Sequence, residues 1–193
     1  MKLLVALTVM GAGTFACARG SGQRPDHPVM VCLNPGGNAA AFLQGEAVAT
    51  QILKQANIRL QWRSAESNCS AGNGLVVAVS SSTPEDLHPG ALAYALPFEG
   101  THIVLFYDRV LSSVGARTIP ALLGHVLAHE IAHILEGVNL HSASGVMKER
   151  WNIPDYVDMQ RGGLKFTRDD IALIDRGMES RAAHSVRPDG QRQ

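Results

Sequence analysis

His129-Glu130-Ile131-Ala132-His133 is the stretch of this sequence from which its fold and chemistry can be inferred. Four residues make just over one helical turn, so both imidazoles project from one face of a helix and can bind a single metal ion. Glu130 lies about 100° around the helix from His129, where its carboxylate can reach a metal-bound water without becoming a ligand. This is the HExxH arrangement, in which zinc acidifies a water and the glutamate accepts the proton.

The residues around this motif predict one long helix, Ile119–Glu136. Thr118 is expected as its N-cap, Pro120 stands early in its first turn, and Gly137 is the left-handed residue that commonly ends a helix. Because the helix is apolar on most sides, its polar trio needs partners, which favours metal binding over two solvent-exposed histidines. His125, one turn before the motif, is expected to be a hydrogen-bonded structural residue.

A third metal ligand must come from beyond the helix, because a catalytic zinc site has three protein ligands and an open position. His141 follows Gly137 with enough chain to turn back toward the pair, and it is expected in this role. Glu149, on a later segment, is the main alternative. The other rivals are acidic: Glu136, Asp155 and Asp158.

Hydrophobic periodicity outside this helix predicts a chain of mixed helices and strands. Strands are expected at residues 29–33, 58–63, 75–79, 91–98 and 102–108. Further helices are expected at residues 39–57 and 168–182, with 139–152 irregular between the last two helices. Thr167 and Asp170 resemble a capping box at the start of the last helix.

Composition narrows the class of protein. The 193 residues are 46% hydrophobic and 18% charged, which is typical of one globular domain and excludes a disordered chain. Lys and Arg total 17, as do Asp and Glu, and aromatic residues make up 5%, so we expect no nucleic-acid partner. Beyond the N-terminus no apolar run approaches about eighteen residues, so no membrane span is expected in the body of the chain.

The N-terminus predicts export. Lys2 precedes a short apolar run and then small residues, which is the pattern of a secretory signal peptide over residues 1–18. Ala16-Cys17-Ala18 provides an A-x-A cleavage site, and the Gly- and Pro-containing residues 19–28 are expected to form a linker. The alternative is a lipoprotein signal, in which Cys17 carries a lipid anchor. Either route predicts a periplasmic or secreted protein.

Two cysteines beyond the signal, Cys32 and Cys69, are expected to pair. In an oxidising compartment an even number of cysteines indicates a disulfide. Thiolate ligands for a metal are the alternative, but the chain has no C-x-x-C spacing. The predicted bridge ties the first strand to the loop after the second strand.

Residues 129–141, HEIAHILEGVNLH, and the following SGVM that ends at Met147 resemble the metzincin zinc endopeptidases. The likeness is greatest to small secreted bacterial metzincin-like proteins that share the HSxxGxM continuation. The resemblance implies that His129, His133 and His141 are zinc ligands, that Glu130 is the general base, and that Met147 is the apolar floor of the site. The usual family spacing is HExxHxxGxxH, so the glycine here comes one residue late and the third histidine two.

The same resemblance implies a fold and an activity. We expect an α+β domain of the metzincin or zincin type over residues 29–183, followed by a flexible tail at 184–193. It would have a twisted mixed sheet with one antiparallel edge strand, a cleft below that edge, an active-site helix, a Met-turn and a C-terminal helix. The implied function is a secreted zinc metalloendopeptidase, a monomer that binds an extended peptide along residues 91–96. Two alternatives stay open: an exported metal-binding protein without turnover, and a zinc hydrolase with a non-peptide substrate.

Overall fold

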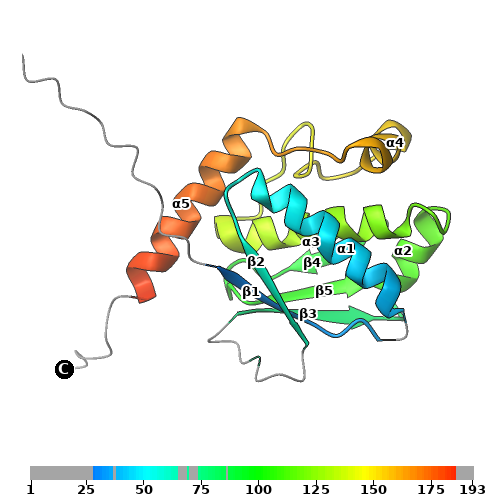
Figure 1. The fold of residues 1–193 in the computed structure, drawn as a ribbon, viewed down its shortest axis with the longest axis horizontal. Helices are drawn as coiled ribbons and strands as arrows, with labels where there is room; N and C mark the ends of the chain where they lie inside the picture. Colours follow the sequence, from blue (N-terminus) through cyan, green and yellow to red (C-terminus); the bar gives the residue numbers. More distant parts are fainter. Residues whose placement is uncertain (1–27, 37, 65–68, 70–73, 86, 186–193) are drawn as a thin grey trace, which may run out of the picture.

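The computed structural model describes residues 28–36, 38–64, 69, 74–85 and 87–185 (Figure 1). The predicted signal peptide, nearly all of the predicted linker and most of the predicted tail lie outside these residues. Cleavage at residue 18 and lipidation of Cys17 therefore stay predictions.

One mixed β-sheet holds the five strands found among the described residues. These are β1 Val29–Leu33, β2 Leu60–Ser64, β3 Leu75–Ser80, β4 Ala93–Ala95 and β5 His102–Phe106. Their order across the sheet is β2-β1-β3-β5-β4, with β1, β2, β3 and β5 parallel and β4 antiparallel to β5. The prediction of a mixed sheet with one antiparallel edge strand is confirmed.

Five helices accompany the sheet in the described part of the chain. They are α1 Ala39–Lys54, α2 Tyr107–Ser113, α3 Ile119–Glu136, α4 Ile153–Arg161 and α5 Arg168–Ser185. Figure 1 shows α1 and α3 side by side on the same face of the sheet, with α5 at the C-terminal end of α3. The structure is thus an α+β fold, and α3 has the bounds that the sequence predicts.

The core lies between the sheet and the α1–α3 layer. Val31, Val77 and Leu105, from three different strands, are at most 2% exposed. Helix α3 contributes most of the other side of the core, and residues 122–136 of this helix are all buried. A helix buried on all sides needs an apolar surface in every direction, and this explains the unbroken apolar pattern around its polar motif.

A pair of glycines lets α1 and α3 approach closely. A Cβ added to Gly124 of α3 would overlap the side chain of Val48 and lie 2.8 Å from the carbonyl oxygen of Gly45, both on α1. Only a residue without a side chain fits at this crossing. The HExxH motif begins five residues later on the same helix, so this contact places the motif relative to the sheet.

Several element ends differ from the predictions. The strand predicted at 91–98 has only the three residues of β4, because the chain turns after it: the amides of Glu99 and Gly100 donate to the carbonyl of Leu96. The strand predicted at 102–108 ends at Phe106. Helix α2 follows at once and buries Val110. Helix α4 was not predicted, and only Met159 of its nine residues is buried.

The helix ends that the sequence predicts are confirmed in part. Gly137 ends α3 with a φ of 70°, in the predicted left-handed conformation. Thr167 and Asp170 form the predicted reciprocal cap of α5: each backbone N–H donates to the other's side chain, at 2.7 and 3.1 Å. Thr118 stands at the N-cap position of α3, but its backbone is helical and its side chain makes no capping hydrogen bond, so that prediction is wrong in its chemistry.

The predicted disulfide between Cys32 and Cys69 is confirmed, with their Cα atoms 6.1 Å apart. Cys32 lies in β1 with no exposed surface, and Cys69 lies between β2 and β3. A structural disulfide is typical of proteins outside the cytoplasm. No helix in the described part of the chain combines the length and apolar character that crossing a bilayer requires.

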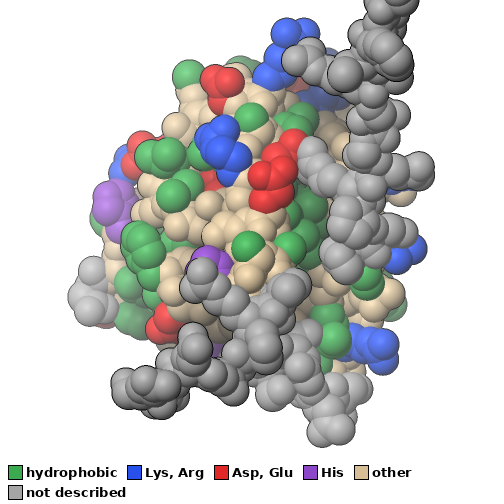
Figure 2. Space-filling view, turned by 90° about the vertical axis from the view of Figure 1, so that its left-hand side faces the viewer, with side chains coloured by type: hydrophobic (Ala, Val, Ile, Leu, Met, Phe, Trp, Pro, Cys, Tyr) green, Lys and Arg blue, Asp and Glu red, His purple; other side chains and the backbone are tan. Residues whose placement is uncertain are grey.

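Charges of both signs are distributed over the surface drawn in Figure 2. Acidic and basic side chains stand among hydrophobic ones on that face, and neither sign forms a continuous patch. This agrees with the equal numbers of basic and acidic residues in the sequence, 17 of each.

Candidate metal centre

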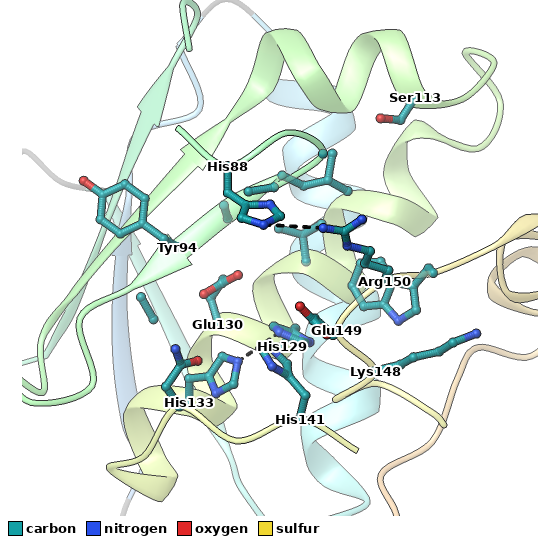
Figure 3. Close-up of a pocket in the computed structure, with 18 of the residues that line it drawn as sticks. His88, Tyr94, Ser113, His129, Glu130, His133, His141, Lys148, Glu149 and Arg150 are labelled. Atoms are coloured by element: carbon teal, nitrogen blue, oxygen red, sulfur yellow. Dashed lines mark hydrogen bonds between the residues drawn. The ribbon is translucent and has the colours of Figure 1, made fainter. Parts of the chain in front are cut away.

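His129 and His133 lie one turn apart on α3 and are 7% and 3% exposed. Their Nε2 atoms are 3.0 Å apart, and Figure 3 shows both rings at the wall of one cavity. Each Nδ1 faces a backbone carbonyl: that of Val146 at 2.8 Å from His129, and that of Val138 at 3.3 Å from His133. Because a carbonyl oxygen can only accept, each Nδ1 carries the proton and each Nε2 presents a lone pair.

The two Nε2 lone pairs are close enough together to bind one metal ion. Burial is the main cause that lowers the pKa of His129 to about 4 and that of His133 to about 3, so both rings are neutral at pH 7. Two nitrogen lone pairs at 3.0 Å repel one another unless a cation lies between them. Hydrogen bonds from Nδ1 to backbone carbonyls are also the usual way in which metal-binding imidazoles are oriented.

His141 completes the group. Its ring centroid lies 5.3 Å from that of His129 and 5.0 Å from that of His133. One nitrogen from each of the three rings lies within 4.8 Å of the others, so the three residues could hold a metal ion. His129 and His133 are buried, whereas His141 is exposed, so the site opens toward solvent on the side of the third histidine.

The chain that carries His141 is held in place just after this residue. The Ser142 amide donates to the carbonyl of Met147 at 2.8 Å, and the Ser142 hydroxyl donates to Asp170 of α5 at 2.5 Å. Met147 is 1% exposed, and the carbonyl of its neighbour Val146 is the one that accepts from His129. The segment after His141 therefore both fixes the third histidine and orients the first.

Glu130 faces the same cavity from α3, as Figure 3 shows. Its side chain is nearly buried, and this burial raises the pKa of Glu130 to about 8. A hydrogen bond from the backbone N–H of Ala95 in β4 opposes the shift in part. A buried carboxyl with a high proton affinity, beside a site that could hold a metal, can accept and release a proton.

None of the acidic rivals for the third ligand belongs to the group of three residues that could hold a metal. Glu149 lines the cavity but does not belong to the group of three that could hold a metal. Asp155 accepts from Lys148 at 2.5 Å and from the amide of Asn152 at 2.7 Å, where it forms the capping box of α4. Glu136 is buried, and neither oxygen of its carboxylate has a hydrogen-bond partner among the described residues. Asp158 lies on α4 and is not part of the cavity wall.

His125 has the structural role that the sequence predicts. Its Nδ1 donates to the Ala121 carbonyl at 2.7 Å, and its Nε2 accepts from the amide of Leu164 at 2.9 Å. Both ring nitrogens are thus occupied in a fully buried side chain. Burial lowers the pKa of His125, as expected for a neutral ring.

The cavity around the three histidines has a volume of about 560 Å³. One wall is formed by residues 88–95, which include β4, and the opposite wall by α3 and residues 148–151. Sequence reasoning missed Trp151, whose indole N–H donates to Gly145 at 3.2 Å and whose ring lies 5.6 Å from that of His129. It also missed His88 and Arg150, because no local pattern marks residues that meet only across a cavity.

Comparison with known proteins adds no family. Neither a scan against models of protein families nor a search of curated proteins gives a match for this chain. The conclusion therefore rests on the geometry of the site, in which three imidazoles that could hold a metal ion lie beside a nearly buried carboxyl and an edge strand.

Proposed function

We propose that this protein is a zinc-dependent endopeptidase of the metzincin type that acts outside the cytoplasm. The observation that carries the proposal is the convergence of three imidazoles on one point, with the Glu130 carboxyl in the same cavity. His129, His133 and His141 would hold the zinc, and Glu130 would be the general base. Zinc is favoured because three neutral nitrogen donors with an open fourth position form a common catalytic zinc site.

Glu130 has the position and the proton affinity that the proposed reaction needs. When bound, zinc lowers the pKa of a water to about 7 and polarises the carbonyl of the bond to be cleaved. Because burial raises the proton affinity of this side chain, its ionised form readily accepts the proton of the attacking water. The same oxygen atoms can then pass that proton to the nitrogen of the leaving amine.

Strand β4 supports a peptide substrate. It is the edge strand of the sheet, and its three residues line the cavity. The Leu96 amide donates to His102 of β5 at 3.0 Å, and successive amides of a strand point to opposite sides, so the amides of Ala93 and Ala95 point away from β5. The Ala95 amide is directed at Glu130, which leaves the Ala93 amide for a peptide. An extended peptide can add to such an edge through main-chain hydrogen bonds. This would place its backbone across the three histidines.

The rest of the proposal concerns the form of the protein. The disulfide supports export, and we propose a signal peptide over residues 1–18, a linker at 19–28 and a metallopeptidase domain over 29–183. Residues 184–193 would be a flexible tail, and the mature protein would be a monomer.

The test is a comparison of the purified mature chain with its Glu130→Gln variant. We expect one zinc per chain in both proteins by elemental analysis, and cleavage of a broad peptide library by the wild type. The variant keeps all three imidazoles but has no carboxylate to accept a proton, so its rate should fall by about three orders of magnitude. Glu179→Gln, which removes an exposed carboxylate from α5 outside the cavity, is the matched control and should cleave normally.

Other outcomes would change the assignment. Cleavage by Glu130→Gln at a rate near that of the wild type would show that the proposed mechanism is wrong. Zinc binding without any cleavage would favour an exported metal-binding protein. Hydrolysis of esters or other non-peptide bonds alone would favour a zinc hydrolase with a different substrate, because the same residues activate water for either reaction.

A further inference from the structure

Arg150 is a cavity residue that the proposed reaction does not use. Its exposed side chain lines the wall opposite β4, and Figure 3 shows its guanidinium beside His88. Among the described residues it forms no ion pair, and its guanidinium approaches the His88 Nε2 at 3.4 Å. Lys148 on the same wall is different, because its ammonium is paired with Asp155 at 2.5 Å. Arg150 therefore brings a positive charge to the cavity without a carboxylate partner in the described chain.

His88 acts as a hydrogen-bond acceptor for this guanidinium. Its Nδ1 lies 3.2 Å from the carbonyl oxygen of Pro89, so Nδ1 carries the proton and Nε2 is left to accept from Arg150. The loop that carries His88 is anchored from behind by Arg109 of α2. One nitrogen of Arg109 donates to the carbonyls of both His88 and Ala91, each at 2.9 Å.

The backbone around Arg150 is held equally firmly. The indole of Trp151, the next residue, donates to Gly145 and packs edge-on against His129 with ring centroids 5.6 Å apart. Two residues before Arg150, Lys148 is tied to α4 through Asp155. The position of Arg150 is thus fixed relative to the histidines that could hold a metal, even though its own side chain is exposed.

We propose that Arg150 binds a carboxylate of the substrate and makes the cavity selective for peptides that carry one beside the scissile bond. A guanidinium has five N–H donors in a planar fork, and the contact with His88 uses one of them. The remaining donors match the two oxygens of a carboxylate in a bidentate pair. This inference rests on the proposed function, because it assumes that the cavity binds peptides.

The carboxylate has two sources in a peptide, an acidic side chain and the C-terminus. Both present the same two oxygens to Arg150, so the structure assigns the chemistry and the experiment must separate the sources. Glu149 lines the same wall and brings a negative charge that opposes any carboxylate. Its removal should therefore strengthen the binding that Arg150 provides.

Binding is measured without turnover, in zinc-loaded protein that carries Glu130→Gln. The probe is a library of hexapeptides with one Glu or one Gln at each position in turn, made both with a free C-terminus and with an amide. Mass spectrometry measures the ratio of carboxylate-bearing to neutral peptides among those that are retained. We expect this ratio to be about tenfold higher than in the starting library, which corresponds to one charge-assisted hydrogen-bonded pair. The Glu/Gln arms and the free/amide arms then identify which carboxylate is bound.

Arg150→Gln should abolish this enrichment, and Arg150→Lys should keep part of it, because lysine retains the charge but lacks the planar fork. Arg176→Gln removes the same charge from the exposed surface of α5 and should keep the full enrichment. Glu149→Gln should increase it. Thermal unfolding of each variant checks that the fold is intact. If Arg150→Gln does not fold, the loss of enrichment in Arg150→Lys provides the test instead.

The outcomes separate this inference from the proposed function. Equal retention of the charged and neutral peptides, retention of neither, or an enrichment that persists in Arg150→Gln would overturn the role of Arg150. Cleavage of the library by the wild type without any carboxylate preference would overturn it too, while leaving the peptidase proposal intact. Enrichment that depends on Arg150, in a protein whose wild type cleaves nothing, would support carboxylate binding and remove the peptidase proposal.

Discussion

Two backbone carbonyl oxygens determine how His129 and His133 can act. By accepting from Nδ1, Val146 and Val138 hold the proton on the far side of each ring and leave Nε2 free. Burial keeps both rings neutral, since it lowers the pKa of each well below 7. The pair is therefore arranged for a cation before any ion binds, and His141 adds a third nitrogen from the solvent side.

The third ligand can be tested by two substitutions. His141→Ala removes one of the three nitrogens that lie within 4.8 Å of one another, whereas Glu149→Ala removes a carboxylate outside this group. We expect His141→Ala to weaken zinc binding about a hundredfold or more, because even the loss of an outer partner of a ligand costs 10- to 100-fold. Glu149→Ala should change affinity only slightly. A chelator titration that gives the reverse order would identify Glu149 as the ligand.

Glu136 is a second buried carboxyl of α3, and its protonation affects the stability of the fold. It is 7% exposed, and in the part of the chain that the structure describes neither of its oxygens has a hydrogen-bond partner. Burial, together with the negative charge of Asp170, raises the pKa of Glu136 from 4.5 to about 8. Between pH 4.5 and about pH 8, the folded state therefore keeps the Glu136 proton that the unfolded state has released.

This difference predicts how stability changes with pH. The contribution of the Glu136 proton is fully present below about pH 4.5 and is lost as the pH rises through about 8. Glu136→Gln cannot titrate, so its stability relative to the wild type should rise by on the order of 2 kcal/mol between pH 5 and pH 8. Urea unfolding at both pH values, with chelator present, measures this. Exposed Glu179→Gln is the control, and an equal pH response in both variants would contradict the prediction.

At the scale of elements, α3 connects the core to the site. Its N-terminal half packs against α1 through Gly124, its C-terminal half carries the HExxH motif, and its end at Gly137 turns the chain toward His141. A displacement of α3 relative to α1 would therefore move two of the three histidines relative to strand β4. The close approach of α1 and α3 consequently matters for the geometry of the cavity as well as for stability.

Gly124→Ala tests that approach. The new methyl group would overlap Val48 and lie 2.8 Å from the carbonyl oxygen of Gly45, so the helices must separate. Overpacking outweighs the better helix propensity of alanine, and we expect a net loss of about 1–3 kcal/mol in the free energy of unfolding. Gly115→Ala is the control, because a Cβ there would meet nothing within 4 Å. Urea unfolding of both variants gives the comparison, and equal stability would show that the helices can adjust.

At the scale of the whole molecule, the helices α1 and α3 cover one face of the sheet (Figure 1). The disulfide joins β1 to Cys69, between β2 and β3. The bridge spans 37 residues of sequence and so includes α1 and β2. By restricting the unfolded chain over this length, it stabilises the fold even though it lies outside the cavity.

Replacement of both cysteines, Cys32→Ala with Cys69→Ala, should lower the free energy of unfolding by about 3 kcal/mol on the loop-entropy argument. Reduction of the wild type should produce the same loss and should leave the double variant unchanged. Denaturant unfolding with and without reductant measures both effects. Mass mapping of non-reduced exported protein that finds both thiols free would contradict the bridge itself.

The sequence by itself determined the local features. The long apolar period places α3 at Ile119–Glu136, Gly137 ends it, and the spacing of the motif puts two imidazoles on one face. The pair of cysteines beyond the predicted export signal is also sufficient to predict the disulfide. Each of these signals depends on residues close in sequence, or on a count, so no knowledge of packing was needed.

The tertiary structure alone brings His141 beside His129 and His133 and leaves the acidic rivals outside this group, because this depends on where the chain after Gly137 returns to α3. It also shows that β4 has three residues, since turn hydrogen bonds end this strand. The meeting of His88 with Arg150 is the extreme case, because 62 residues of sequence separate them. Contacts of this kind arise from packing of the whole chain, which local periodicity does not encode.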